Sequence, residues 1–451
     1  MVGAAIDAGA VQLVSVGNNK LLAVPSDVEG FDGEPAEING HAVRLVVKTS
    51  AAAAAVRELL PHLRPRALGT APSFGFGDRI GLATPGHIRA LRSTGSTLAP
   101  VLAQQSAREL ARTGRSFTDV LDAATWGALE AGWTSGYGAD ADHLRTTEEV
   151  ESALAAEFTM FTLDPSAHVD ERAREASSAD LESSVETLPW DMLAGDWQAM
   201  KSRYGAEADN LEIARAACVF GRAIAHVVQL ARVLDGTTHD IEVSVDETDA
   251  PTTPFEHLFI AVELHRLGVA FTSLAPRFPG RWQKALDLEE DLEAVAHAVR
   301  QHARIAADHG AYKLSIHSGS DKFSIYKVLA EASSGNLHVK TSGTSYLEGL
   351  RVIAATEPDM FREILAIARS RFELDRDSYE LSAEAHVPLG EDDLAALLDD
   401  PGARQGLHVT YGAVLSDAKI GPALLAALED ASDEYTRVLE NHLGRHLALL
   451  Q

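Results

Sequence analysis

Along most of the chain, short apolar segments alternate with longer segments whose apolar residues recur at helical spacing. The short segments predict strands, and the longer ones predict amphipathic helices. Long helices are expected at Leu211–Leu234, which is rich in alanine, at Gln283–Asp308 and at Tyr346–Ile367. The eight strand candidates are Arg79–Thr84, Tyr137–Asp142, Phe158–Asp164, Ile241–Asp246, Val269–Ser273, Lys313–His317, His338–Thr341 and Val409–Val414.

This alternation determines the expected fold class, which is α/β. Parallel strands joined by helices form either a closed barrel or an open doubly wound sheet. Eight strands with intervening helices favour a (β/α)8 barrel of the TIM type. The open sheet would need a glycine-rich turn between a strand and a helix to cradle a dinucleotide. The segment Gly75–Asp78 precedes its strand candidate instead of following one, so it fails that requirement.

Both ends of the chain depart from the barrel pattern. Residues 1–68 contain three strand-like segments and one helix, which predicts a small N-terminal α+β cap. Residues 69–420 hold the catalytic barrel, with an acidic insertion near 165–210 that is expected to lie over the barrel mouth. Residues 421–451 predict a helical C-terminal tail.

Composition and charge narrow the classes of partner. A net charge of -27 argues against nucleic acid or an anionic membrane surface, because both would repel the protein. The one cysteine, Cys218, cannot form an internal disulfide, which fits a reducing compartment. The segment Met1–Asp7 lacks a basic region before an apolar run, and no stretch is expected to span a bilayer. We therefore expect a cytoplasmic protein, as either a monomer or a homo-oligomer.

Polar residues at the ends of the strand candidates carry the expected chemistry. The C-terminal ends of barrel strands converge on one mouth, where active sites lie. Because side chains alternate between the barrel interior and the helix layer, outward Leu314 and Ile316 place their polar neighbours inside. The same parity argument predicts these inward or rim residues: Asp140, Asp142, His143, Thr162, Asp164, Glu242, Ser244, Asp246, Glu247, Lys313, Ser315, His317, His338 and Lys340.

Charges inside a barrel are costly unless they are paired or bound to a metal. Carboxylate and imidazole ligands suit a divalent Zn, Mn, Co or Ni ion, and the lack of a thiolate removes the softest sites. The favoured ligands are Glu247 and His317, with His338 as a weaker third. Structural ion pairs at the barrel end are the alternative for these three residues.

Several ordered segments of the chain resemble the tagaturonate epimerases, which interconvert tagaturonate and fructuronate. The resemblance runs from about residue 70 to residue 350 and implies a barrel fold and a divalent metal. The resemblance also implies that the substrate of the protein is a small ketohexuronate. The matching segments are Gly77–Ile88, Leu102–Ser106, Gly138–Leu144, Lys313–Phe323 and Lys340–Glu348.

The implied reaction inverts a hydroxyl carbon one bond beyond the carbon next to the ketone. The carbonyl does not acidify the hydrogen on that carbon, so α-proton removal cannot invert it. Retro-aldol cleavage, rotation of the aldehyde fragment and re-addition would do so, with the metal polarising the ketone. The candidates for moving the hydroxyl proton are Asp142, His143 and Asp164, although capping of the next helix would also explain them. The candidate substrate contacts are Lys322 and Lys340 for the carboxylate, and Gln105, Ser106 and Thr162 for hydroxyls. The alternative for Lys340 is an ion pair with an interior aspartate.

Other functions remain open at this point. A class II aldolase-like lyase would use the same metal but release fragments, and a related epimerase would act on another ketose. A sugar-acid binding protein needs neither a metal nor interior proton carriers, so the array of charged residues disfavours it. A route through transient oxidation would need a nicotinamide cofactor, for which the sequence offers no site.

Overall fold

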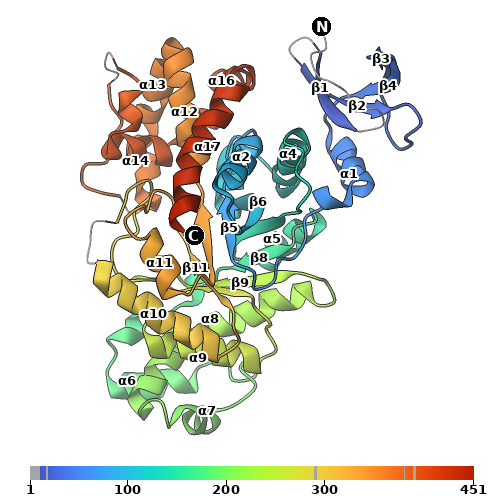
Figure 1. Cartoon of the computed structure of the whole chain (residues 1–451). Coiled ribbons are helices and arrows are strands. Elements are labelled where there is room, and N and C mark those ends of the chain that lie inside the picture. Colours follow the sequence, from blue (N-terminus) through green and yellow to red (C-terminus); the bar gives the residue numbers. More distant parts are fainter. Residues whose placement is uncertain (1–10, 17–18, 289–291, 380, 390–392) are drawn as a thin grey trace.

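The computed structural model describes residues 11–451 except 17–18, 289–291, 380 and 390–392, so Met1–Asp7 lies outside the described residues. Its centre is a closed barrel of parallel strands surrounded by helices (Figure 1). Pairing between the last strand and the first closes the barrel. The expected (β/α)8 fold is therefore confirmed. In order, the strands are β5 (Ser73–Phe76), β6 (Ala99–Ser106), β7 (Gly138–Leu144), β8 (Met160–Leu163), β9 (Asp240–Ser244), β10 (Ser273–Ala275), β11 (Lys313–Ile316) and β12 (Leu337–Thr341).

Two of the eight strand predictions were wrong. Residues 79–83 form a turn in which the Asp78 carboxylate accepts hydrogen bonds from the backbone N–H groups of Ile80, Gly81 and Ala83. These N–H groups therefore cannot form the hydrogen bonds of a strand, and the first barrel strand, β5, ends just before this turn. Residues 409–414 are helical, at the junction of two helices. The candidate Val269–Ser273 meets β10 only at its last residue.

The helices follow the expected pattern with shifted ends. The long Ala-rich helix is α8, Asn210–Ala231, with a 3-10 turn to Leu234. The predicted Gln283–Asp308 helix begins later, as α10 (Leu292–Asp308), and residues 289–291 of that prediction lie outside the described residues. The predicted Tyr346–Ile367 helix is two helices, because Pro358 starts a new one. These are α12 (Thr344–Thr356) and α13 (Pro358–Asp375).

The remaining helices cover the barrel or extend from it. α9 follows β9, α11 follows β11, and α3 and α4 both follow β6. Their bounds are α2 Thr84–Thr94, α3 Ala107–Thr113, α4 Phe117–Glu130, α5 Thr147–Ala155, α6 Ser178–Glu186, α7 Trp197–Tyr204, α9 Pro254–Arg266, α11 Tyr326–Ala332, α14 Pro401–Val409 and α15 Tyr411–Ser416.

By length and composition alone, α8 with its 3-10 turn could cross a membrane, which the sequence analysis did not anticipate. Most of this helix is buried inside the protein, however, among α5, α6, α7 and α9. That burial is expected of a core helix, which is apolar because it is covered on several sides.

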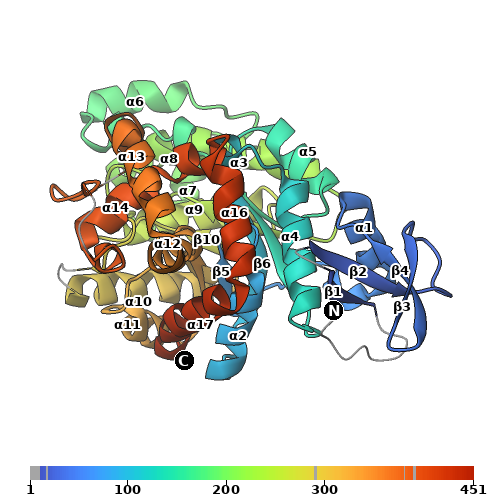
Figure 2. The ribbon, with the colours of Figure 1, turned by 90° about the horizontal axis from the view of Figure 1, so that it is seen from above.

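The N-terminal part is a separate antiparallel sheet beside the barrel. Its strands lie in the order β1-β2-β4-β3, and α1 (Ser50–Leu59) follows them. Both views place this sheet at one side of the molecule, near α1 and α4 (Figure 1, Figure 2). The strands are β1 Gln12–Val16, β2 Asn19–Pro25, β3 Glu34–Ile38 and β4 His41–Val46.

The C-terminal part closes the helical ring. α17 (Ser432–Leu449) packs against α2 and α12, next to the seam where β12 meets β5 (Figure 1). α16 (Ile420–Asp430) precedes it and contacts α12, α13 and α15. The acidic insertion near 165–210 packs against α8 through α6 and α7. None of its side chains lines the pocket at the C-terminal ends of the barrel strands, which is described below.

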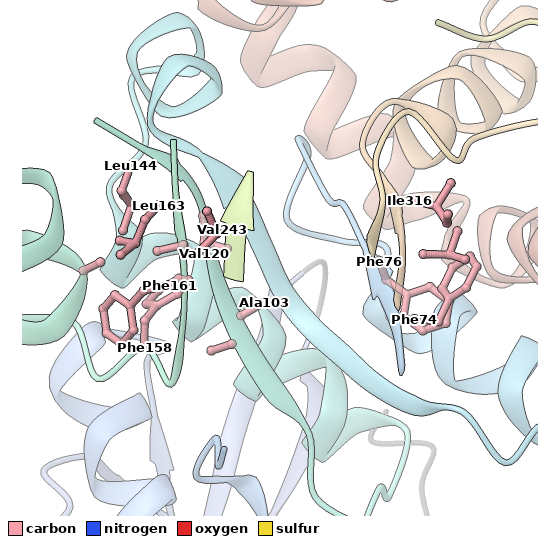
Figure 3. Close-up of a cluster of buried hydrophobic side chains, with 14 of the residues drawn as sticks. Phe74, Phe76, Ala103, Val120, Leu144, Phe158, Phe161, Leu163, Val243 and Ile316 are labelled. Carbon is pink, nitrogen blue, oxygen red and sulfur yellow. The ribbon is translucent and has the colours of Figure 1, made fainter. Parts of the chain in front are cut away.

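The apolar core lies between the strands and the helices. Figure 3 shows Leu144 of β7 beside Leu163 of β8, and Phe161 of β8 beside Phe158, on one side of the barrel. On another side, Phe74 and Phe76 lie beside Ile316. The opposite parity therefore faces the barrel interior, where charged residues replace the branched apolar residues that usually fill such barrels. These charges position the candidate site.

Candidate active site

Lys340 on β12 lies at the centre of a buried ion-pair cluster inside the barrel. Its Nζ lies 2.7 Å from Asp140 Oδ2, 2.8 Å from Asp142 Oδ1 and 2.8 Å from Glu242 Oε1. It also donates to Thr162 Oγ1 at 2.6 Å. Burial opposes the charged amine, but the three carboxylates raise the pKa of Lys340 well above its usual value. Its positive charge is thus already balanced by protein carboxylates.

The carboxylates of this cluster differ in their pKa values. Burial raises the pKa of Asp140 to about 6, even with Lys340 beside it. Burial also acts on Asp142, but there the ammonium of Lys340 lowers the pKa to about 2. Asp142 is therefore the carboxylate that stays charged at the mouth side of the cluster, where its side chain is 13% exposed.

His317 follows the last residue of β11 and is held between two carboxylates, Glu242 on β9 and Asp246 just after β9, with β10 between the two strands. Its Nε2 lies 2.6 Å from Glu242 Oε1, and its Nδ1 lies 3.1 Å from Asp246 Oδ1. Burial lowers the pKa of an imidazole, but Asp246 and Glu242 outweigh it and raise the pKa of His317 to about 10. The carboxylates thus attract a positive charge to this position, which either a proton or a cation can supply.

His143 lies beside His317 at the rim. The two rings meet edge to face with centroids 5.0 Å apart. His143 has a φ of 52°, and the register between β7 and β8 shifts at this point, which turns its side chain toward the mouth. Its Nδ1 lies 3.2 Å from Asp164 Oδ2. Burial opposes the charged ring, but Asp142 and Asp164 raise the pKa of His143 to about 9.

Arg145 ties the same carboxylate to Glu247, which follows the adjacent strand β9. Its Nε lies 2.7 Å from Asp164 Oδ2, and its guanidinium reaches Glu247 Oε2 at 2.7 Å. Arg108 holds the other oxygen of Glu247 at 3.2 Å. Against the effect of burial, His143 and Arg145 hold the pKa of Asp164 far below its usual range. Asp164 also accepts a hydrogen bond from the backbone N–H of Ser166 at 2.9 Å, so both of its oxygens are already held by protein donors.

These groups open into a pocket of about 270 Å³ at the C-terminal ends of the strands. It combines imidazoles, carboxylates and cations with aromatic walls, as expected for a site that binds a small polar anion. Its lining residues are Arg108, His143, Asp246, Glu247, Pro276, Arg277, Phe278, Trp282, Lys284, His317, Ser318 and Tyr379.

Two groups at the mouth have the geometry to hold a metal ion. The ligand atoms of Asp142, His143 and His317 lie within 4.8 Å of one another, and so do those of His143, Asp164 and Glu247. Oxygen and imidazole donors of this kind fit Zn, Mn, Co or Ni. The donor set therefore fits the divalent cation that the resemblance implies, and His143 belongs to both groups.

A third group of potential ligands lies away from the mouth, between α17 and the loop after β11. There Asp321 accepts hydrogen bonds from Arg404 at 2.9 Å and from His442 Nε2 at 2.5 Å. His446 Nε2 accepts from the backbone N–H of Asp321 at 3.0 Å. Because each member already has a protein partner, this cluster is a tie between the C-terminal helix and the barrel.

The structure does not bring His338 to the other two predicted metal ligands. His338 pairs with Ser315 in the sheet, two residues before His317, so it lies deeper in the barrel. Its Nδ1 lies 2.9 Å from Ser73 Oγ, and burial lowers its pKa to about 3. His143 takes the place at the mouth that the sequence analysis gave to His338.

Four of the predicted substrate contacts have structural partners. Thr162 lies inside the Lys340 cluster, and Gln105 accepts from Arg115 at 3.1 Å. Ser106 caps α3. Lys322 is buried and donates to backbone carbonyl groups, at 2.7 Å in the case of Gln283. None of these four side chains lines the pocket.

Sequence reasoning missed the cations and aromatic residues of the pocket wall. Arg108 comes just after β6, a strand that was not predicted, so nothing in the sequence indicated that Arg108 lies at the mouth. Arg277 follows β10, and a strand candidate extended to Ala275 would have revealed it. Lys284 was assigned to a helix, although residues 283–288 precede α10. Tyr379 comes from the region after α13, which no local pattern connects to the mouth.

Together, the fold and the mouth define an α/β-barrel enzyme whose site suits a small, polar, anionic molecule. The chain belongs to the tagaturonate epimerase family, since the profile of that family matches residues 4–450. It is an isomerase by that membership, and the resemblance seen in the sequence is confirmed.

Individual relatives agree with this membership. The chain is 43% identical over 408 residues to the tagaturonate/fructuronate epimerase of Thermotoga maritima. The aligned region covers 88% of this chain and 84% of that protein. It also matches fructuronate-tagaturonate epimerase UxaE from Cohnella laeviribosi, in a native crystal structure and in one with a single glycerol. Both matches have a TM-score of 0.89 and 34% identity, and they cover 98% of this chain and 93% of theirs.

Proposed function

We propose that this protein interconverts D-tagaturonate and D-fructuronate with the help of a divalent metal ion. Family membership supports the substrate, because the relatives are named for this pair of sugar acids. The observation that carries the metal requirement is the convergence of Asp142, His143 and His317, whose ligand atoms lie within 4.8 Å of one another at the barrel mouth.

Asp142, His143 and His317 are the residues that we assign to the metal. The alternative group contains Asp164 and Glu247, which already share the guanidinium of Arg145. A bound divalent ion would polarise the substrate ketone and stabilise negative charge that develops on its oxygen. Because the pKa values of His143 and His317 are raised to about 9 and about 10, metal binding must displace protons from these rings.

The remaining residues position these ligands and move a proton. Asp164 accepts from His143 Nδ1 and thereby leaves the other ring nitrogen to face Asp142 and the mouth. Glu247 lines the pocket, and two arginines hold its carboxylate in the pocket wall. We assign Glu247 to the exchange of the substrate hydroxyl proton.

This assignment gives a balanced route for epimerisation. Glu247 takes the proton from the hydroxyl of the carbon that is inverted. The bond from that carbon to its neighbour beside the ketone then breaks, which gives an aldehyde and an enediolate. The aldehyde rotates and presents its other face, the enediolate carbon attacks it, and the new alkoxide recovers the proton from Glu247. No oxidant is consumed, and no atoms are lost.

An NMR assay of the chelated protein with tagaturonate tests this function. Fructuronate should form when Zn, Mn, Co or Ni is restored, without accumulating fragments. Fragments released in place of fructuronate would indicate an aldolase-like lyase, which shares the bond cleavage. Absence of conversion with all four metals would contradict the proposed substrate, and a tightly bound nicotinamide would contradict the retro-aldol route.

Two variants separate the proposed roles. His317→Ala should lose both bound metal and activity, because it removes a ligand. Glu247→Gln should keep the metal and lose activity by about 100- to 10000-fold, the usual range for a proton-transfer residue. Metal analysis of both purified variants decides the matter, since a Glu247→Gln protein without metal would make Glu247 a ligand.

A further inference from the structure

Lys284 lies in the wall of the mouth pocket, in the segment between β10 and α10. Its Nζ donates a hydrogen bond to Ser318 Oγ. Ser318 directly follows His317, so the ammonium lies next to the proposed metal ligands but belongs to a different part of the chain. A substrate bound at His317 would extend toward Lys284.

The partners of Lys284 distinguish it from the other cations of the pocket. Arg108 is paired with the carboxylate of Glu247, and Arg277 donates to the backbone carbonyl of Asp246. Among the residues that the structure describes, no carboxylate lies within ion-pair distance of Lys284 Nζ. Burial lowers the pKa of Lys284, which Glu247 and Asp246 oppose only from a distance. The side chain of Lys284 is half-buried in the pocket wall, so its ammonium keeps part of its hydration until a bound anion replaces that water.

The backbone around Lys284 is held in place from both sides. Lys322 Nζ donates to the carbonyl oxygen of Gln283 at 2.7 Å and also to that of Leu286. The side chain of Gln405 on α14 donates to the carbonyl oxygen of Lys284 at 3.2 Å. The side chains of Lys322 and Gln405 thus hold the short segment that carries Lys284, which lies outside any helix or strand.

We propose that Lys284 binds the carboxylate of the sugar acid, and that Lys322 positions Lys284 without touching the substrate. This inference rests on the proposed function, since it takes a ketohexuronate as the ligand. The ketone end of the substrate lies at the His317 side of the pocket, and the carboxylate end meets Lys284. Lys284 is therefore the residue that selects a uronate over the neutral ketohexose.

Selection follows from the loss of water around the ammonium of Lys284 when a sugar binds over it. A uronate carboxylate supplies the missing anion and forms a charge-assisted hydrogen bond. In D-tagatose a CH₂OH group takes the place of the carboxylate, so the bound sugar would cover the ammonium without supplying a counter-charge. Affinity for the neutral sugar is therefore lower, because the covered ammonium loses water and gains no anionic partner.

Calorimetric titration of the metal-loaded protein with D-tagaturonate and with D-tagatose tests this selection. Lys284→Met should weaken tagaturonate binding by about 10- to 100-fold and leave tagatose binding unchanged or stronger. Lys284→Arg keeps the charge and should stay within about tenfold of the wild type. Lys327→Met removes an exposed lysine of α11 and is the matched control, with no change expected for either sugar.

Lys322→Met tests the positioning role. It should reduce the preference for tagaturonate over tagatose, whereas a purely structural loss would weaken both sugars equally. KM for tagaturonate should rise more than kcat falls in both the Lys284→Met and Lys322→Met proteins.

The outcomes separate this inference from the function on which it rests. If the wild type binds tagaturonate and Lys284→Met binds it equally well, or loses both sugars equally, the role of Lys284 is wrong and the epimerase remains. If the wild type fails to bind tagaturonate, the proposed function itself is wrong, and the inference falls with it.

Discussion

Lys340 carries the positive charge that keeps three carboxylates together inside the barrel. Replacing it with methionine would leave Asp140, Asp142 and Glu242 facing one another without the ammonium that lies between them. We expect Lys340→Met to lower the free energy of unfolding by about 3–5 kcal/mol, the usual cost of breaking a buried ion pair. Urea denaturation of the metal-free protein measures the loss.

A second substitution shows whether charge causes that loss. In the double variant Lys340→Met/Asp140→Asn, one negative charge is removed together with the positive one, so part of the stability should return. The two single changes should therefore be non-additive by about 1–3 kcal/mol. Strictly additive losses would mean that packing around the lysine stem, and not charge, accounts for the effect.

At the scale of single residues, strand parity predicted which side chains point into the barrel but not which groups they contact there. Lys340, His338 and Lys313 were expected inside the barrel, and all three are buried there. Parity cannot tell how deep a residue lies, because depth depends on the relative register of strands that are far apart in sequence. His338 was therefore assigned to the metal ligands, and for Lys340 a contact with the substrate carboxylate was preferred over a pair with an interior aspartate.

Two glycines at the contact of α2 with α17 should respond in opposite ways to alanine. A Cβ at Gly86 would lie 2.6 Å from Leu439 Cβ, so Gly86→Ala forces the helices apart and should cost about 1–3 kcal/mol. A Cβ at Gly444 meets nothing closer than 3.6 Å, from Thr94. Gly444→Ala should gain about 0.5–1 kcal/mol, since glycine inside a helix is unfavourable.

Thermal unfolding of the two alanine variants beside the wild type checks this pair. The melting temperature should fall for Gly86→Ala and rise for Gly444→Ala. Equal shifts of the same sign would mean that the close approach of the two helices is not what requires glycine at residue 86.

At the scale of elements, periodicity identified helices and buried strands but misjudged segments with polar ends. β6 ends in Gln104, Gln105 and Ser106, and this polar end hid a strand that is buried throughout most of its length. Residues 409–414 are β-branched and aromatic in part, yet they are helical because α14 and α15 pack against α13 and α3. Such tertiary contacts override local propensity and leave no local signal.

At the scale of the whole molecule, the barrel and its metal-compatible mouth followed from sequence, whereas the pocket wall did not. The strand ends are set by a repeating pattern, so His143 and His317 could be placed at one mouth. Lys284 and Tyr379 reach that mouth from irregular segments after β10 and α13. Their positions depend on how the complete chain packs, which no local pattern encodes.

Global stability should fall in mild acid because of a buried pair of histidines. His257 Nδ1 and His302 Nδ1 lie 2.7 Å apart, so one ring must offer a lone pair to the N–H of the other. Burial lowers the pKa of His302 to about 4 and that of His257 well below its usual value. Between pH 6.5 and 4 the unfolded chain therefore binds protons that the folded one refuses, and stability decreases as the pH falls.

Replacing His302 with glutamine removes one of these groups while keeping a hydrogen-bonding side chain beside His257. At pH 7 the variant should be less stable than the wild type by about 1 kcal/mol, because the pair is imperfectly replaced. At pH 5 the stability of the variant relative to the wild type should be about 2 kcal/mol more favourable than at pH 7. Only the wild type is destabilised there by keeping His302 neutral while the unfolded chain binds a proton. Urea denaturation at both pH values measures the change, with His297→Gln on the exposed face of α10 as the control. A stability difference that is the same at pH 7 and pH 5 would show that His302 accepts a proton in the folded protein as readily as in the unfolded chain.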